Sequence, residues 1–141
     1  MIHFSNADTQ APLRDRTALK IVLRHLFEQE KQPLRTLQYI FCSDDYLLRI
    51  NRDFLQHDYY TDIITFQLGE APDTLGVEGE IYISTDRVRD NARTLGIPVK
   101  QELLRVIFHG ALHLCGYKDK TPKEESLMRA KEEEYMVMMA K

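Results

Sequence analysis

The segment from Lys100 to Cys115 constrains the fold most strongly, because it is apolar around most of a helical circumference. A helix of this kind is typical of the centre of a domain rather than of a surface. The chain has 141 residues, of which 43% are hydrophobic and 29% are charged. This length supports one sizeable core but not two. We therefore expect a single domain, residues 1–141, built around this helix.

Hydrophobic periodicity predicts the elements that surround the central helix. Alternating or β-branched runs indicate strands at 2–5, 36–42, 61–68 and 79–85, with a Gly- and Pro-containing loop over 69–79. Helical spacing predicts helices over 13–30, about 44–54, 86–96, 100–115 and from Thr121 onward. The order β-α-β-α-β-β-α-α-α predicts an α+β fold, in which a single mixed sheet of about four strands packs with about five helices.

The last helix has a clear start signal and an acidic middle. Thr121 and Glu124 form a capping box with Pro122 at the first helical position. We expect Leu127, Tyr135 and Met138 to face inward. The run KEEEY at 131–135 is interpreted as a solvent-exposed face, with a partner-binding surface as the alternative.

Charge and composition restrict the class of protein. The formal net charge of -3 argues against binding nucleic acid through a bulk positive field. Local basic clusters remain, and each is either a binding groove or a solvated mixed-charge surface: Arg87, Arg89 and Arg93, and Lys118, Lys120 and Lys123. No apolar run approaches the roughly 18 residues of a membrane span, and no secretory signal is visible. We expect a cytoplasmic protein whose Cys42 and Cys115 are buried thiols.

Two histidines on the central helix indicate a metal site. At about 100° per residue, His109 and His113 project to the same side within one turn. Gly116 allows a left-handed ending, after which Asp119 can return to that side as a third ligand for one divalent cation. Three protein ligands leave a coordination position open for water, which is typical of a hydrolytic site.

Other interpretations of this pair are weaker. Two histidines four residues apart can arise by coincidence, but imidazoles on so apolar a helix are costly unless they are bonded. The spacing makes the helix zincin-like, since it resembles that of the zinc metalloproteases. Those enzymes carry a glutamate base directly after the first histidine. Position 110 is glycine here, so peptide hydrolysis is disfavoured.

The motif HGALHLCGYKD at 109–119 resembles the H-G-x-L-H-L-x-G-Y-D-H signature of the YbeY family of single-domain, metal-dependent endoribonucleases. INRDFLQHDYYTDIITF at 50–66 is similar to the family segment L-N-x-x-Y-R-x-x-D-x-P-T-D-V-L-S-F, and GEIYISTD at 79–86 to its G-D-I-x-I strand. The similarity covers roughly residues 45 to 120 in the same order. It implies a role in maturation of ribosomal RNA and in ribosome quality control.

The resemblance assigns metal ligands residue by residue. His109 and His113 fall on the family's first two ligands, and Asp119 falls where the family more often has a third histidine. Two histidines and a carboxylate accept zinc, although they also suit Fe(II), Mn(II) or Ni(II). We expect one divalent cation, with zinc as our choice.

The substrate-binding part of the resemblance is incomplete. The family's arginine, four residues after Asn51 and associated with substrate phosphate, aligns with Leu55. His57 is a candidate proton donor or phosphate contact, and a solvent-facing loop histidine is the alternative. Thr61 and Asp62 match the family's T-D beside the active-site cleft, or else they only form a turn. Lys118 is a candidate to offset phosphate charge.

Three functional hypotheses follow from the sequence. The first is an endoribonuclease that cleaves single-stranded RNA, with either water or the RNA 2′-OH as the attacking group. Its expected partners are ribosomal RNA or its precursor and the ribosome or small-subunit ribosomal proteins. We expect it to bind neither DNA nor a membrane. The second is a non-catalytic ribosome assembly factor with a structural metal, which the missing arginine favours. The third, a hydrolase of small molecules, requires an enclosed pocket.

Overall fold

The computed structural model describes residues 1–68 and 76–140. Its strands are β1 (Ile2–Asn6), β2 (Leu34–Cys42), β3 (Ile63–Leu68) and β4 (Val77–Ser84). Its helices are α1 (Arg16–Gln29), α2 (Asp44–Leu55), α3 (Thr85–Leu95), α4 (Val99–Leu114) and α5 (Pro122–Ala140). The predicted α+β order is confirmed. The predicted loop lies outside the described residues over 69–75, whereas its last residues, 77–79, belong to β4.

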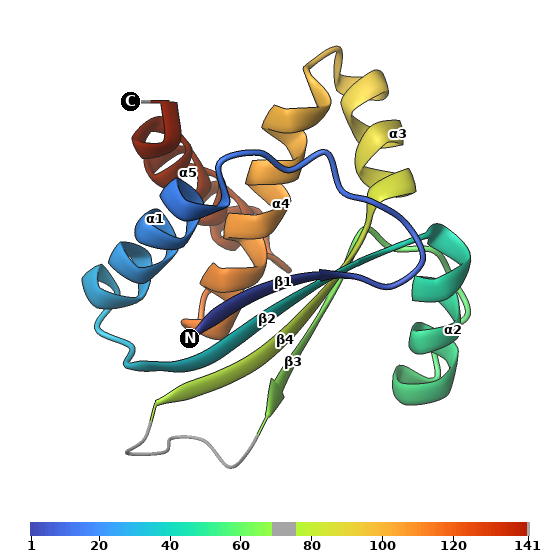
Figure 1. The fold of residues 1–141 in the computed structure, drawn as a ribbon, viewed down its shortest axis with the longest axis horizontal. Helices are drawn as coiled ribbons and strands as arrows, with labels where there is room; N and C mark the ends of the chain where they lie inside the picture. Colours follow the sequence, from blue (N-terminus) through green and yellow to red (C-terminus); the bar gives the residue numbers. More distant parts are fainter. Residues whose placement is uncertain (69–75, 141) are drawn as a thin grey trace.

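The four strands form one mixed sheet in the order β1-β2-β4-β3. β1 and β4 both run parallel to β2, whereas β3 pairs antiparallel with β4. Figure 1 shows α1, α4 and α5 gathered on one side of this sheet, with α2 lying apart from them. The predicted mixed sheet is therefore confirmed.

The central helix α4 is buried against the sheet, as its apolar circumference predicts. Ile107 and Ala111 are fully buried, and the buried hydroxyl of Tyr39 on β2 donates to the carbonyl of Ile107 at 2.8 Å. Gly110 faces the sheet at the closest approach. A Cβ at this position would lie 2.9 Å from Cδ1 of Ile63 and 3.0 Å from Ile81. The glycine thus sets the depth at which α4 packs.

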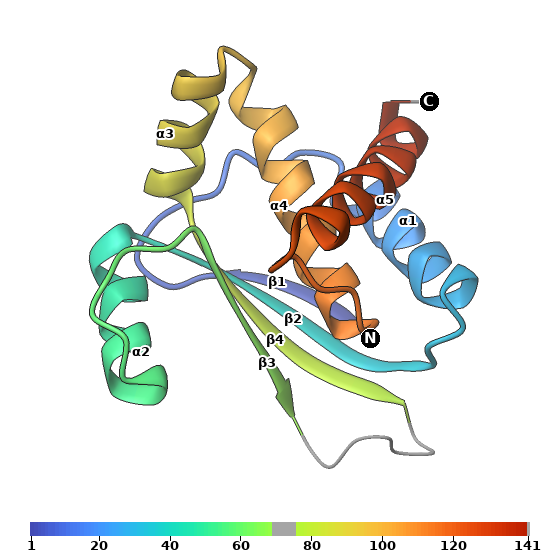
Figure 2. The same ribbon diagram turned by 180° about the vertical axis from the view of Figure 1, so that it is seen from behind.

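On the opposite face of the sheet, α2 packs near one end of the strands, and Figure 2 shows this arrangement from behind. Leu47 packs there with Cys42 and Ile64 in a second, smaller core cluster. Because side chains alternate along a strand, Ile64 faces α2 while Ile63 faces α4.

Helix ends agree with the sequence more closely than helix faces do. The capping box is confirmed, since the Thr121 amide donates to Glu124 Oε1 at 3.0 Å and the Glu124 amide to Thr121 Oγ1 at 3.1 Å. The predicted inward position of Leu127 is wrong, because 51% of it is exposed and Met128 is buried instead. No described helix is both long and apolar enough to cross a membrane.

Candidate metal centre

The two histidines of α4 lie one above the other at its C-terminal end, with ring centroids 4.6 Å apart. The helix ends at Leu114 with Cys115 as its C-cap, and Gly116 then adopts a φ of 104°, the left-handed region predicted for it. The amide of Tyr117 donates back to the carbonyl of Leu112 at 3.0 Å. This turn reverses the chain toward the histidines.

Asp119 meets both histidines after this turn. Its Oδ2 lies 3.2 Å from Nε2 of His109, and its Oδ1 lies 3.6 Å from Nε2 of His113. One potential ligand atom from each of the three residues lies within 4.8 Å of the others. The side chains are 13%, 29% and 38% exposed in the order His109, His113 and Asp119, so the group opens toward solvent on the Asp119 side.

The chemistry of these donors fits a divalent cation. Two imidazole nitrogens and one carboxylate oxygen are the set that open zinc sites use, with a position left for water or substrate. The same set accepts Fe(II), Mn(II) or Ni(II), so it does not choose the metal.

Glu132 on α5 holds His109 from behind. Its Oε2 lies 2.6 Å from Nδ1 of His109, and only 2% of its side chain is exposed. Burial opposes ionisation of Glu132, but the hydrogen bond from His109 and the charges of His109, Arg105 and Arg129 outweigh it and lower its pKa. An ionised carboxylate only accepts hydrogen bonds, so Nδ1 of His109 donates to Glu132, and this bond turns Nε2 toward Asp119.

Two arginines and a second acid surround Glu132. Arg105 donates through Nε to Glu102 Oε1 at 2.8 Å, pairs through Nη2 with the other oxygen of Glu102, and lies 3.5 Å through Nη1 from Glu132 Oε1. Arg129 donates through Nη1 to the same Glu132 oxygen at 3.1 Å. Glu102 is fully buried, as a charge can be only when it is paired.

His113 is prepared for metal binding by its surroundings. Burial, followed by the adjacent His109, lowers the pKa of His113, although Asp119 and a backbone hydrogen bond at Tyr117 oppose this. The ring therefore stays neutral to lower pH than a free histidine and keeps a nitrogen available as a ligand.

Comparison with known proteins places the chain in a family. The family model described as Endoribonuclease YbeY matches residues 2–140. The chain belongs to the endoribonuclease YbeY family. A family relative from Cytophaga hutchinsonii is 54% identical over 132 residues, which cover 94% of this chain and 91% of the relative. Another relative, from Flavobacterium johnsoniae, is 41% identical over 98% of this chain and 96% of its own length. Both carry the name Endoribonuclease YbeY.

A solved structure shares the fold. The solution structure of a protein from Thermotoga maritima has a TM-score of 0.64 and 30% identity, and the match covers 98% of this chain and 88% of that protein. The predicted YbeY resemblance is confirmed by these findings.

The other residues matched to the YbeY segments differ in their position relative to the metal centre. Asp62 lines a hollow of ≈ 150 Å³ together with His109 and Asp119. The hydroxyl of neighbouring Thr61 donates to the carbonyl of Ile63 at 3.4 Å, as in a local turn. Lys118 is exposed beside Asp119.

His57 and Leu55 lie at the end of α2 and in the loop that follows it. The ring of His57 stacks on Tyr59, with centroids 5.2 Å apart, and its Nδ1 lies 3.0 Å from the Tyr59 hydroxyl. Leu55, at the place of the YbeY arginine, is 39% exposed. Among the described residues of the 50–66 segment, Asp62 and Ile63 thus line the hollow beside the candidate ligands.

The cysteines are poor candidates for a nucleophile. Burial raises the pKa of Cys42 and of Cys115 to about 12, with neighbouring carboxylates adding to the effect. Neither thiol is paired.

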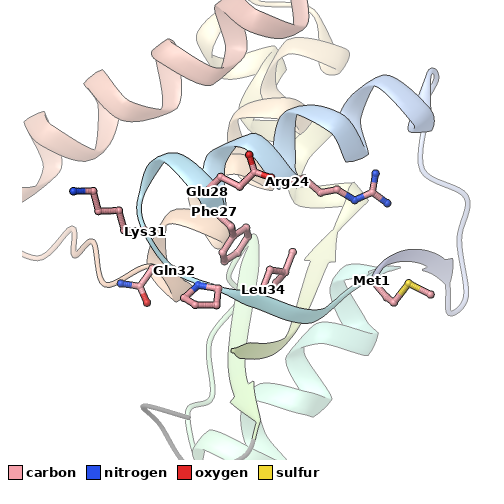
Figure 3. A pocket seen from close by; sticks show the side chains of 8 residues that line it. Met1, Arg24, Phe27, Glu28, Lys31, Gln32 and Leu34 are labelled. Atoms are coloured by element: carbon pink, nitrogen blue, oxygen red, sulfur yellow. The ribbon is translucent and has the colours of Figure 1, made fainter. Parts of the chain in front are cut away.

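A larger hollow of ≈ 490 Å³ lies elsewhere, between the end of α1 and the start of β2. Figure 3 shows Arg24, Glu28 and Leu34 among the side chains around it. It shares no lining residue with the hollow at the metal centre.

The sequence does not predict the role of Glu132, because the run 131–135 indicates a solvent-exposed face. This interpretation is wrong for Glu132, which is 1% exposed, whereas the inward position predicted for Tyr135 is confirmed by its 0% exposure. The signal that could have found Glu132 is its spacing from Met128 and Tyr135. At four and three residues these positions share one helical face, and both neighbours are large and apolar.

Proposed function

We propose that this chain is a metal-dependent endoribonuclease, working as one domain over residues 1–141. The observation that supports the proposal is the convergence of His109, His113 and Asp119, whose ligand atoms lie within 4.8 Å of one another beside an open hollow. The relatives that carry the name endoribonuclease supply the type of bond cleaved.

Each residue of the centre has a distinct part in this activity. A divalent cation bound there would supply a Lewis acid that polarises a phosphoryl oxygen and lowers the pKa of water. Glu132 would keep the proton on Nδ1 of His109 and so fix the direction of Nε2. Asp119, the most exposed of the three, would offset part of the cation's charge at the mouth of the hollow.

The proposed substrate is single-stranded RNA, namely ribosomal RNA or its precursor in the cytoplasm. The proposed partners are ribosomal components. A folded duplex would need a wide, shape-complementary surface, which the hollow of ≈ 150 Å³ at the metal centre does not offer. Zinc is the proposed cation because it accepts this donor set without further ligands.

Cleavage of a defined RNA by purified protein tests the proposal. Metal-stripped protein and His113→Ala should each lose roughly a hundredfold or more of the activity, and metal addition should rescue only the stripped wild type. His25→Ala, which removes an exposed histidine on α1, is the matched control and should behave as wild type. Equal trace cleavage by all samples would overturn the proposal.

The alternative function is a ribosome assembly factor in which the metal fixes the fold. Leu55 favours it, because a leucine side chain has no donor for a substrate phosphate, whereas the arginine at this place in the YbeY segment has five. Under this alternative, metal removal would lower the thermal stability of the protein while no sample cleaved RNA.

A further inference from the structure

A groove leads away from the metal centre along α4 and α5. The hollow of ≈ 150 Å³ at His109 and Asp119 shares Asp62, Arg105 and Arg129 with a second hollow of ≈ 310 Å³. The second hollow reaches the end of α3, where Asn91 and Thr94 line it. The two hollows therefore adjoin each other at these three side chains, and we refer to the pair as the groove.

Arg105 is not available to a ligand in this groove. Its side chain is 18% exposed, and its Nε and Nη2 are engaged by the buried carboxylate of Glu102. Its remaining nitrogen, Nη1, faces Glu132. The charges of Arg105 and Glu102 neutralise each other, and Arg105 also lies beside the carboxylate of Glu132.

Arg129 is in the opposite situation. Its side chain is 63% exposed, and Glu132 engages it through Nη1 at 3.1 Å. A guanidinium has five N–H donors in a planar fork. The bond to Glu132 therefore engages one nitrogen of the group, while the side chain stays largely exposed and lines both hollows.

The charges lining the groove make Arg129 the group that an anion would meet. Beyond the Arg105–Glu102 pair, the charged lining residues are Asp62, Asp119 and Arg129, and Arg129 alone of them is positive, with one nitrogen bonded to Glu132. A cation at the metal centre would offset Asp119. An RNA backbone entering the groove would then find Arg129 as the exposed positive side chain among the described lining residues.

We propose that Arg129 binds a backbone phosphate of the RNA next to the one at the metal centre, and so serves the phosphate contact that Leu55 cannot make. This inference rests on the proposed function. The ion pair with Glu132 holds Arg129 on the same carboxylate that orients His109, which fixes the phosphate contact relative to the metal ligands. Arginine suits this contact because its fork matches two phosphate oxygens at once.

The test compares Arg129→Gln with Arg24→Gln, which removes an exposed arginine on α1 at the separate larger hollow. Binding of a short fluorescein-labelled single-stranded RNA to metal-loaded protein is followed by anisotropy over a range of salt concentrations. Arg129→Gln should bind roughly tenfold more weakly. The slope of log K against log salt should become shallower by about 0.7, the value for one single-strand phosphate. Arg129→Lys should retain the slope.

The outcomes separate the two proposals. Metal content is measured on the same samples, and Arg129→Gln should have the metal content of wild type. If Arg129 only supported Glu132, Arg129→Gln would instead lower the metal content and leave the salt slope unchanged. If Arg129→Gln binds RNA with the affinity and slope of Arg24→Gln, the phosphate contact is refuted while the nuclease proposal stands. If wild-type protein neither binds nor cleaves RNA in a metal-dependent way, the nuclease proposal itself fails.

Discussion

Glu132 differs from its acidic neighbours on α5 because it is buried and accepts hydrogen bonds from side chains of both α4 and α5. Its carboxylate accepts hydrogen bonds from Nδ1 of His109 at 2.6 Å and from Nη1 of Arg129 at 3.1 Å, while Glu133 beside it is exposed. Carboxylates behind metal-ligating histidines fix the tautomer and orientation of the ring. The metal centre thus comprises the three candidate ligands and Glu132, which supports His109 without contacting the cation.

Replacing Glu132 by glutamine should weaken metal binding roughly tenfold to a hundredfold, because a neutral amide holds the Nδ1 proton of His109 less strongly. Competition with a chromophoric chelator measures the affinity. Glu133→Gln removes a neighbouring exposed charge and should leave the affinity unchanged. Equal affinities for the two variants would show that Glu132 has no part in metal binding.

Residue spacing within α4 and its C-terminal turn predicted the three candidate ligands, because that geometry is local: one helical turn, one glycine and a short return. Glu132 could not be found by this route, since its position depends on how α5 packs against α4. The burial of the Glu102–Arg105 pair could not be predicted from the sequence for a related reason. An i,i+3 acid–arginine pair has the same sequence on a surface as in a core, and packing alone distinguishes them.

At the scale of elements, the contact of α4 with the sheet explains why the centre lacks the base of the zinc metalloproteases. The residue after His109 faces Ile63 and Ile81, where even a Cβ would be only 2.9 to 3.0 Å from side-chain carbon atoms. A glutamate at this position would point into the core and away from substrate.

Gly110→Glu should therefore lower the free energy of unfolding by about 3 kcal/mol or more, because it forces an unpaired charge between α4 and the sheet. Urea unfolding followed by circular dichroism measures the loss. Gln101→Glu adds the same charge at an exposed site of α4 and should change stability by no more than about 0.5 kcal/mol. A Gly110→Glu variant as stable as Gln101→Glu would contradict the packing described for α4.

The whole molecule is closed by contacts among α1, α5 and the turn after α4. Glu30, just past the end of α1, accepts hydrogen bonds from Tyr117 at 2.7 Å and Tyr135 at 2.8 Å, and Lys131 lies 3.4 Å away. These contacts tie the turn that carries Asp119 to helices from both ends of the chain. The metal centre therefore depends on segments that the motif does not include.

Glu30 also makes stability depend on pH. Burial alone would raise its pKa, but the hydrogen bonds from Tyr117 and Tyr135 and the charge of Lys131 outweigh burial and lower the pKa below 4.5. A carboxyl whose pKa is lower in the folded state stabilises the protein above the unfolded value and loses this effect as pH falls through the folded one.

Glu30→Gln should accordingly cost about 1 to 3 kcal/mol at pH 7 in metal-free protein, and the difference from wild type should shrink as the pH falls below 4.5. Chemical unfolding at several pH values measures both. Glu28→Gln, on the exposed side of the same helix, should show neither effect. A deficit for Glu30→Gln that persisted unchanged into acid would contradict this account of Glu30.

Stoichiometric reconstitution tests the central claim most directly. Zinc, or another divalent cation that restores activity, is added in steps to chelated protein while cleavage of a defined single-stranded RNA is followed. The rate should rise linearly and reach a plateau at one cation per chain, and His113→Ala should show no such rise. Full cleavage by the chelated protein, or the same titration curve for His113→Ala, would contradict a function built on these three residues.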